Sequence, residues 1–423
     1  MDFISGNQSS LIKNIISVFY WIVISLWVDD SLIVEVWLKL MNKFNILFSF
    51  MFFMSMTSWA QVTCVPEGNP VVKTVPLNVP AISAGQDMPL GTGIFSARYV
   101  VTPESSPKAK CSTTTLPDTY EFGTFIAIDS APLPLTDYTG GPFGGAIYQT
   151  RIPGVGVALS TTLRSEPLKA GSPKMHSAPV TMTESPRYSV FSTFEVYVHL
   201  IKIGDIAPGS YQLSAEDIPS FKIYYDNTPG KTPALAGQYT THRINISGSM
   251  TVTTQTCQTS DVFVNMGNHE IQKTFRGIGS TTNWIDVPVQ LTNCPIFYGY
   301  YSYNSATGNL PILDSRLGPV YRDSKNNNLG IRITPLTDVI DATRGIMAID
   351  TNSSGSALGV GIQLGWGSPS AFLFNFNNER TYELPKDGNP TIRLPLVARY
   401  IQTADSVKPG RADGKAVFLI NYN

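Results

Sequence analysis

The sequence predicts an all-β protein built from two β-sandwich domains. Short runs in which apolar and polar residues alternate recur between clusters of Gly, Pro, Asn and Asp, a pattern typical of sandwiches. Long helical patterns are absent after residue 60. Charged residues make up 14% of the chain, against about 25% in an average domain. Together these observations indicate an extracellular β protein.

Alternating strands are predicted in both halves of the chain. In the first half, four apolar residues alternate with more polar ones, and this pattern places His199 on the polar face as a surface residue. The four apolar residues are Phe194, Val196, Val198 and Leu200. In the second half, similar runs cover 285–291, 358–364 and 392–398, the last broken by Pro395. Because proline cannot donate a ladder hydrogen bond, the last run is expected at an edge or a bulge.

The N-terminus has the features of a secretory signal peptide over residues 41–60. Lys43 precedes an apolar block from Ile46 to Met56, and Ser58-Trp59-Ala60 supplies the small residues of a cleavage site. The block falls short of the ~20 residues that a membrane span requires. Because this signal is complete from Met41, residues 1–40 are expected to be an over-extended reading frame; an uncleaved anchor is the alternative.

The remaining chain of roughly 360 residues suits two domains. Asn227-Thr228-Pro229-Gly230 and Pro233 interrupt the strand pattern and predict a boundary between Pro229 and Ile244. We therefore expect domains at 61–243 and 244–423.

Four cysteines follow the signal peptide, so disulfides formed in an oxidising compartment are expected. Four cysteines allow three pairings, among which the sequence alone does not choose. Pairing within each half is the economical arrangement, and it joins Cys64 to Cys111 and Cys257 to Cys294. A zinc site is the competing interpretation, but neither a C-x-x-C nor an H-x-x-x-H spacing supports it.

Catalysis, cofactor binding, metal binding and nucleic-acid binding are not predicted. Gly154-Val155-Gly156 is a fragment of a dinucleotide motif with no helical pattern after it, and no G-x-S-x-G element occurs. The four histidines lack metal spacing. With a net charge of −1 and no basic stripe, the chain has no feature that favours nucleic acid or anionic membranes.

The last predicted strand carries the strongest functional signal. Ala416, Phe418, Ile420 and Tyr422 alternate with Val417, Leu419 and Asn421, and Asn423 follows. This run is apolar on both faces and predicts a strand buried on both sides. An unpaired apolar edge recruits another chain, so the strand is expected either to aggregate or to receive a partner strand from a second molecule.

Motifs in the second half are similar to those of chaperone–usher fimbrial pilin domains, and the resemblance covers residues 244–423. The matching segments, in order, are Ile246–Gly248, Thr256–Cys257, Asp261–Gly267, Ile285–Cys294, Gly359–Leu364, Ala398–Tyr400, Val407–Gly410 and Phe418–Tyr422. Their order and the two cysteines make the resemblance specific.

The resemblance implies an immunoglobulin-like sandwich that lacks its last strand. In that family a periplasmic chaperone lends a strand, and the next fimbrial subunit replaces it after export through an outer-membrane usher. Such β-augmentation combines backbone hydrogen bonds with alternate side-chain pockets. Carried onto this sequence, the interface comprises Ala416, Phe418, Ile420, Tyr422 and Asn423, whose carboxylate meets basic chaperone residues.

Residues 148–157 and 200–204 resemble segments of the receptor-binding domain of two-domain tip adhesins, a domain that replaces the usual donor extension. This layout implies a protein secreted through the periplasm to a fimbrial tip, where it binds a glycan or protein receptor. Planar polar groups beside aromatic faces suit sugars, and loops are their usual bearers. The candidates are Asp118, Tyr120, Asp137, Tyr138 and Arg151. A structural or adaptor subunit without receptor binding is the alternative.

Overall fold

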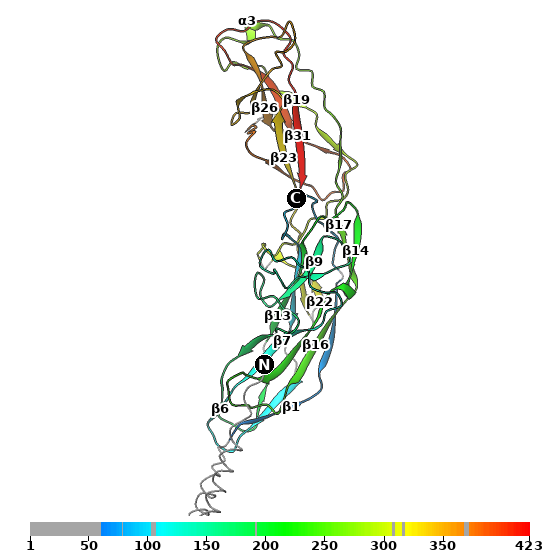
Figure 1. The fold of residues 1–423 in the computed structure, drawn as a ribbon, viewed down its shortest axis with the longest axis vertical. Helices are drawn as coiled ribbons and strands as arrows, with labels where there is room; N and C mark the ends of the chain where they lie inside the picture. The colour runs from blue at the N-terminus through cyan, green and yellow to red at the C-terminus, as the bar shows by residue number, and fades with distance from the viewer. Residues whose placement is uncertain are drawn as a thin grey trace, which may run out of the picture. The chain divides into compact units, whose positions relative to one another are not determined.

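The computed structural model describes residues 61–77, 79–102, 107–190, 193–306, 309–314, 318–367 and 372–423. The predicted signal peptide and the segment before it therefore lie outside the described residues. Strands dominate the described chain, and the helical elements given for it are a short turn, α3 (Ile271–Thr274), and a 3₁₀ turn, η1 (Ala215–Asp217) (Figure 1). The prediction of an all-β fold is confirmed.

Two large sheets organise the first half. Their strands alternate with turns and pair mostly in antiparallel fashion, while β2 adds to β16 in parallel. One sheet runs β10 (Lys174–Ser177), β7 (Phe122–Ser130), β15 (Ser220–Asn227), β16 (Tyr239–Ser247) and β2 (Val71–Pro76). The other runs β22 (Gly318–Val320), β21 (Ile312–Asp314), β4 (Gly93–Val101), β13 (Phe194–Lys202), β9 (Val155–Ser160) and β8 (Tyr148–Gln149).

Three smaller sheets complete this half. They are β1 (Thr63–Glu67) with β5 (Lys108–Ser112) and β12 (Arg187–Ser189); β11 (Val180–Met182) with β6 (Asp118–Tyr120); and β14 (Ser210–Ser214) with β17 (Ser249–Thr253) and β3 (Ile82–Ser83). A single cluster of buried apolar side chains, which we call the first core, fills the space between the sheets. Because β16 and β17 pair only with strands of this half, the first half's sheets extend to Thr253.

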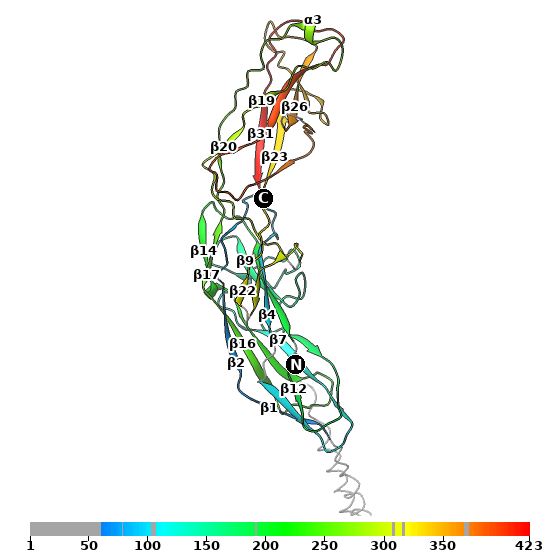
Figure 2. The same cartoon turned by 180° about the vertical axis from the view of Figure 1, so that it is seen from behind.

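The second half consists of one large sheet and two smaller ones around a second core (Figure 2). The large sheet runs β19 (Ile285–Val287), β30 (Leu396–Gln402), β26 (Val360–Trp366), β25 (Ile346–Ala348) and β24 (Val339–Asp341), with β27 (Phe372–Leu373) also paired to β26. The smaller sheets are β18 (Gln258–Thr259), β20 (Gln290–Thr292) and β29 (Ile392–Arg393), and β28 (Arg380–Glu383), β23 (Asn328–Pro335) and β31 (Ala416–Tyr422).

Each disulfide joins two cysteines of the same half, as the economical pairing predicts. Cys64 joins Cys111 across the paired strands β1 and β5, where the two residues lie directly opposite each other. Cys257 joins Cys294, next to the pairing of β18 with β20. Both cysteines of the first bond are fully buried in the first core.

Loss of the Cys257–Cys294 bond should destabilise the second half selectively. The bond closes a loop with a sequence separation of 37, so its removal frees the unfolded chain and should cost about 2–5 kcal/mol. We expect the Cys257→Ser/Cys294→Ser variant to unfold at lower urea, with earlier proteolysis of the second half. The Cys64→Ser/Cys111→Ser variant is the matched control and should show earlier proteolysis of the first half instead. Identical cleavage patterns in the two variants would argue against separate local roles.

Candidate functional site

The C-terminal strand β31 has one paired edge and one free edge. Its partner is β23, in a register that runs from Leu329 opposite Tyr422 to Pro335 opposite Ala416 (Figures 1 and 2). Within the described part of the chain, no strand pairs with the other edge of β31, which ends its sheet. The site is therefore an open sheet edge at the end of the chain.

The hydrogen bonds of Tyr422 show which backbone groups face this free edge. Tyr422 N donates to Asp87 Oδ2 at 2.8 Å, and Asp87 N donates to Tyr422 O at 3.0 Å, so the backbone of Tyr422 points away from β23. In an antiparallel pair, N–H and C=O groups of alternate residues point to the same side. The N–H and C=O groups of Phe418 and Ile420 therefore also face the free edge.

The side chains of β31 divide between core and solvent. Phe418, Ile420 and Tyr422 pack against the second core, whereas Val417 and Leu419 are 53% and 55% exposed. The prediction that both faces of this strand are buried is therefore wrong for the outward face. Val417 and Leu419 are exposed because nothing in the described chain packs against the outward face of β31.

Beside the inward face lies an open apolar depression, which we call the groove. It is shallow: its free volume is about 10 Å³, little more than one water molecule, and six of the seven residues that line it are buried. The residues that line it are Val289, Ile331, Ile333, Trp366, Leu394, Leu396 and Phe418. All seven side chains are apolar, so the groove presents no polar side chain to a ligand. A partner that covers apolar surface here stabilises the complex by about 25 cal/mol for each Å² removed from water.

A second run with alternating burial, residues 261–267, packs against the same core. Val262, Val264 and Met266 are partly buried against the second core, while Phe263 between them is 92% exposed. Neither strand nor bridge is assigned in the described chain between Ser260 and Glu270. Two segments therefore border the second core without full sheet pairing. Strand β31 is paired on one edge, and 261–267 is in no sheet of the described chain.

A loop from the first half closes the end of β31. Asp87 binds the backbone of Tyr422 as described, and a Cβ on Gly85 would lie 2.2 Å from Tyr422 O, so only glycine fits there. Cys257 N donates to the Tyr422 hydroxyl at 3.0 Å. Burial raises the pKa of this hydroxyl, the bond from Cys257 lowers it, and the carboxylate of Asp87 raises it. The free edge therefore ends at Tyr422.

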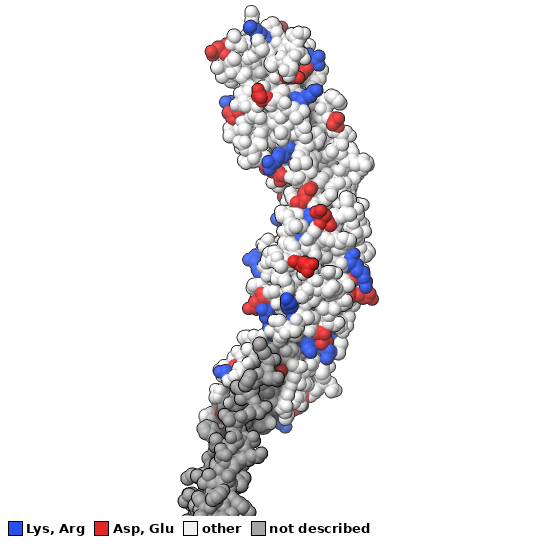
Figure 3. Space-filling view, viewed as in Figure 1, with Lys and Arg blue, Asp and Glu red and all other residues white. Residues whose placement is uncertain are grey.

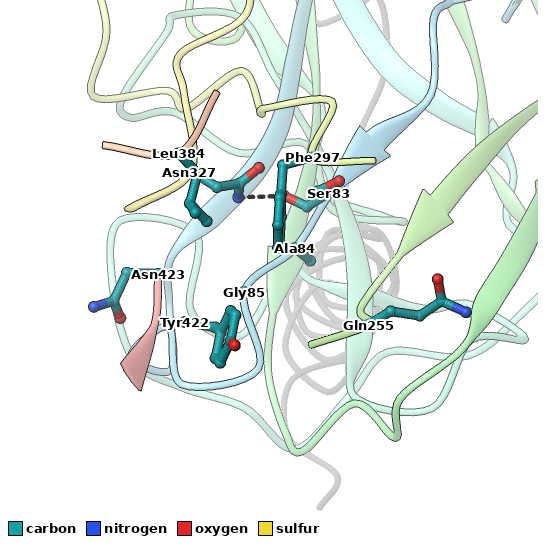
Figure 4. Close-up of a pocket in the computed structure, with 9 residues that line it drawn as sticks. All are labelled: Ser83, Ala84, Gly85, Gln255, Phe297, Asn327, Leu384, Tyr422 and Asn423. Atoms are coloured by element: carbon teal, nitrogen blue, oxygen red, sulfur yellow. Dashed lines mark hydrogen bonds between the residues drawn. The ribbon is translucent and has the colours of Figure 1, made fainter. Parts of the chain in front are cut away.

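Figure 4 shows a small cavity at this end of the strand. Its lining comprises Ser83, Ala84, Gly85, Gln255, Phe297, Asn327, Leu384, Tyr422 and Asn423. The Asn327 side chain donates to Ser83 O at 2.9 Å, and Asn423 exchanges two backbone hydrogen bonds with Asn328. The C-terminal residue is thus held in the sheet.

The five residues predicted for the strand interface accordingly share one strand, but in different surroundings. Ala416 is exposed opposite Pro335, Phe418 and Ile420 lie along the groove side, and Tyr422 is buried. Asn423 is partly buried beside Asn328.

The receptor-binding candidates fall into three separate places, and among the described contacts no hydrogen bond or ion pair joins one place to another. Asp118 accepts a hydrogen bond from the Thr113 hydroxyl at 2.8 Å, and Tyr120 on the same strand is buried. Asp137 is exposed, and its neighbour Tyr138 packs against a small cluster around Phe143.

Arg151 lies beside η1 and is held by carboxylates. Its Nη1 atom is 3.3 Å from Asp217 Oδ1 and 3.8 Å from Glu216 Oε2, and its backbone N–H donates to Asp217 Oδ2. The guanidinium group stays 65% exposed, while Asp217 is buried. Of the five candidates, Arg151 and Asp137 present their polar groups to solvent most openly.

His199 is fully buried, and the prediction of a surface position is wrong. Strand β13 is buried on both faces, and His199 is covered by the stacked ring of Phe143, 4.4 Å away between centroids, and by the edge of the Tyr303 ring. Ser160 donates to Thr162 O, so its oxygen accepts from His199 Nε2 at 3.0 Å, and Nδ1 accepts from the Ser96 hydroxyl at 2.9 Å. Burial lowers the pKa of His199 to about 3.

The neutral state of His199 predicts a pH-dependent stability. In the unfolded chain His199 takes up a proton near pH 6.5, and in the folded chain only near pH 3. The free energy of unfolding therefore has its full value above pH 6.5 and falls as the pH drops from 6.5 toward 3. The loss should approach about 1.4 kcal/mol per pH unit. Urea unfolding from pH 7 to pH 4 measures it. His199→Gln should flatten the slope, whereas the exposed control His176→Gln should keep it; an unchanged slope in His199→Gln would contradict the assignment.

Charges of both signs are scattered over the face seen in Figure 3, without a large patch of one sign. A metal-binding group of His, Cys, Asp or Glu side chains is not found among the described residues. None of the described helices has the length and apolar character needed to cross a membrane. The site with distinctive geometry is thus the open strand edge with its apolar groove.

The comparisons with known proteins find a family match for the second half. Residues 244–423 match the family model described as "Fimbrial protein". The match covers the residues over which the motifs resemble fimbrial pilin domains, and the family is one of fimbrial proteins rather than enzymes. No curated protein matches the chain.

Several solved structures are similar to this chain at low identity. The CupB6 tip adhesin from Pseudomonas aeruginosa is 15% identical, with 85% of this chain and 94% of that chain covered and a TM-score of 0.30. The receptor binding domain of the adhesin MrkD1P of Klebsiella pneumoniae is 14% identical, with 47% and 98% covered and a TM-score of 0.26. The CsuC–CsuE chaperone–tip adhesion subunit complex of Acinetobacter baumannii is 11% identical, with 85% and 100% covered and a TM-score of 0.24. With TM-scores of 0.30 or less, these likenesses carry no argument of their own.

Proposed function

We propose that the chain is a fimbrial tip adhesin that is assembled by donor-strand complementation and attaches bacteria to a host or surface receptor. The observation that carries this proposal is the free edge of β31 beside an apolar groove. A strand added there would bond the backbones of Phe418 and Ile420 and place alternate side chains in the groove.

The groove defines the chemistry of the incoming strand. All seven lining side chains are apolar, so alternate apolar residues of an extended segment suit it, and charged residues at those positions do not. The segment 261–267 borders the same core and offers a second unpaired backbone. We assign the strand first to a periplasmic chaperone and then to the next fimbrial subunit, with an outer-membrane usher as the exporting partner.

The first half supports the adhesin role over that of an ordinary subunit. It forms sheets around a core of its own and carries its own disulfide, whereas a donor extension would be a single free strand. We assign receptor binding to residues 61–243 and the fimbrial role to residues 244–423. The site on the cell is accordingly the fimbrial tip, reached through the periplasm.

Receptor binding is tested with the full chain, complemented by a donor peptide, on an array of glycans and matrix proteins. The adhesin proposal expects binding to at least one receptor class and loss of that binding in some of the variants Asp118→Ala, Asp137→Ala, Tyr138→Ala and Arg151→Ala. Exposed positions in the second half, such as Leu336→Asn, serve as controls. Binding to none of the glycans and matrix proteins on the array would favour the alternative, a structural or adaptor subunit.

A further inference from the structure

Part of the fimbrial match is built into the first half of the molecule. We call residues 298–306 and 309–314 the strap. They follow Phe297, which belongs to the second core, and precede Leu329, which returns to it. The chain thus passes between the two cores at three places: between Thr253 and Cys257, between Phe297 and Gly299, and between Lys325 and Leu329.

The side chains of the strap are buried in the first half. Tyr300, Tyr301, Leu310 and Leu313 belong to the first core, with at most 7% exposure. Tyr303 belongs to the cluster of Phe143 beside it. None of these five large side chains contributes to the core of the fimbrial half.

Hydrogen bonds fix the start of the strap to the strands it crosses. Ser83 N donates to Gly299 O at 2.8 Å, and the Tyr303 hydroxyl donates to Gly91 O at 2.6 Å. A Cβ on Gly93 would lie 2.4 Å from the Tyr303 ring, so this glycine admits the ring. Arg164 adds a bond from Nε to Tyr303 O at 3.2 Å.

The end of the strap extends a sheet of the first half. Strand β21 pairs in parallel with β4, with Ile312 opposite Arg98 and Leu313 opposite Tyr99. Arg98 N also donates to Pro311 O at 2.8 Å. Strand β4 would otherwise have a free edge here, because its other neighbour is β13.

We propose that the strap locks the two halves together and holds them in one relative arrangement. A single linker at 254–256 would leave the halves free to swing. Here the halves can part only if four large side chains leave the first core, Tyr303 leaves the cluster of Phe143, and β21 leaves β4. The strap also makes a fragment ending at residue 243 incomplete, since that fragment lacks β21 and four side chains of its own core. This inference stands on the described contacts and does not depend on receptor binding.

A distance measurement between spin labels tests the lock. Labels at Ser172→Cys and Ser354→Cys occupy exposed positions in the two halves, and the described cysteines are all in disulfides. We expect one narrow distance distribution in the full chain. The undocked variant Leu310→Asn/Leu313→Asn should broaden it, whereas the control Leu336→Asn/Leu358→Asn, at exposed sites, should not. A broad or split distribution in the unaltered chain, or an undocked variant as narrow as its control, would overturn the proposal.

Amide exchange in the unaltered chain decides the matter if the undocked variant does not fold. The amide of Arg98 bonds to the strap, so the lock expects it to exchange within about tenfold of the amides of β13. Exchange of Arg98 at the rate of an open amide, while β13 stays protected, would show that the strap detaches readily and would refute the lock.

Discussion

Phe418→Glu is expected to abolish capture of a partner strand. The Phe418 side chain lines the groove, where every neighbouring lining residue is apolar, so a carboxylate there would be buried without a partner. A cost of about 3 kcal/mol corresponds to a loss of roughly a hundredfold in affinity. Titration with a fluorescent peptide of alternating apolar and polar residues measures the loss.

Leu419→Glu is the matched control for this change. Leu419 is the next residue of the same strand, but its side chain is 55% exposed on the outward face. The same carboxylate placed there meets water and should change peptide affinity by less than about threefold. Equal losses at the two positions would show that the groove does not receive the partner's side chains.

A donor strand supplied in cis should stabilise the second half strongly. An appended segment after Asn423, joined by a Gly/Ser linker, can lie along the free edge, widen the shallow groove and bury two or three large apolar side chains against it. At about 1.5–3 kcal/mol for each buried side chain, less the cost of ordering the segment, the expected gain is about 3–5 kcal/mol. Urea unfolding measures this gain.

The control for the appended strand keeps its length and linker but replaces the inward apolar residues with Ser and Asn. This version retains the backbone hydrogen bonds and loses the groove contacts, so most of the gain should disappear. If the chain is as stable without any appended strand as with the apolar one, the second core is already complete and the donor-strand proposal fails.

Much of the fold could be predicted from local patterns. Alternation of apolar residues between turn signals identifies strands wherever one face is buried, as in β31. The even number of cysteines, two in each half, led to the correct disulfides. The order of motifs over residues 244–423 led to the fimbrial family.

Other features depend on which segments become neighbours, and alternation does not encode that. His199 looks like a surface residue because its immediate neighbours alternate, yet β4 and β9 enclose β13 and neighbouring rings cover the histidine. Leu419 looks like a core residue because it is apolar, yet nothing described covers its face. The one hint of the strap was its unusual concentration of tyrosines between Tyr298 and Tyr303.

For the same reason, the sequence does not show which of the receptor-binding candidates lie close together. Asp118, Tyr138 and Arg151 have side chains suited to sugar binding, but suitability of residue type does not bring distant loops together. The strand interface was foreseeable because a single strand carries its residues and its alternation fixes their direction. The groove was not, because its lining comes from several segments.

The most direct test of the account is amide exchange at Phe418 and Ile420. Both N–H groups face the free edge of β31, so in the full chain without a partner they should exchange much faster than Leu419, which faces β23. Addition of the alternating apolar peptide should slow both amides to the rate of Leu419. Strong protection of Phe418 and Ile420 before any peptide is added, or no change after it, would contradict an open strand-accepting edge.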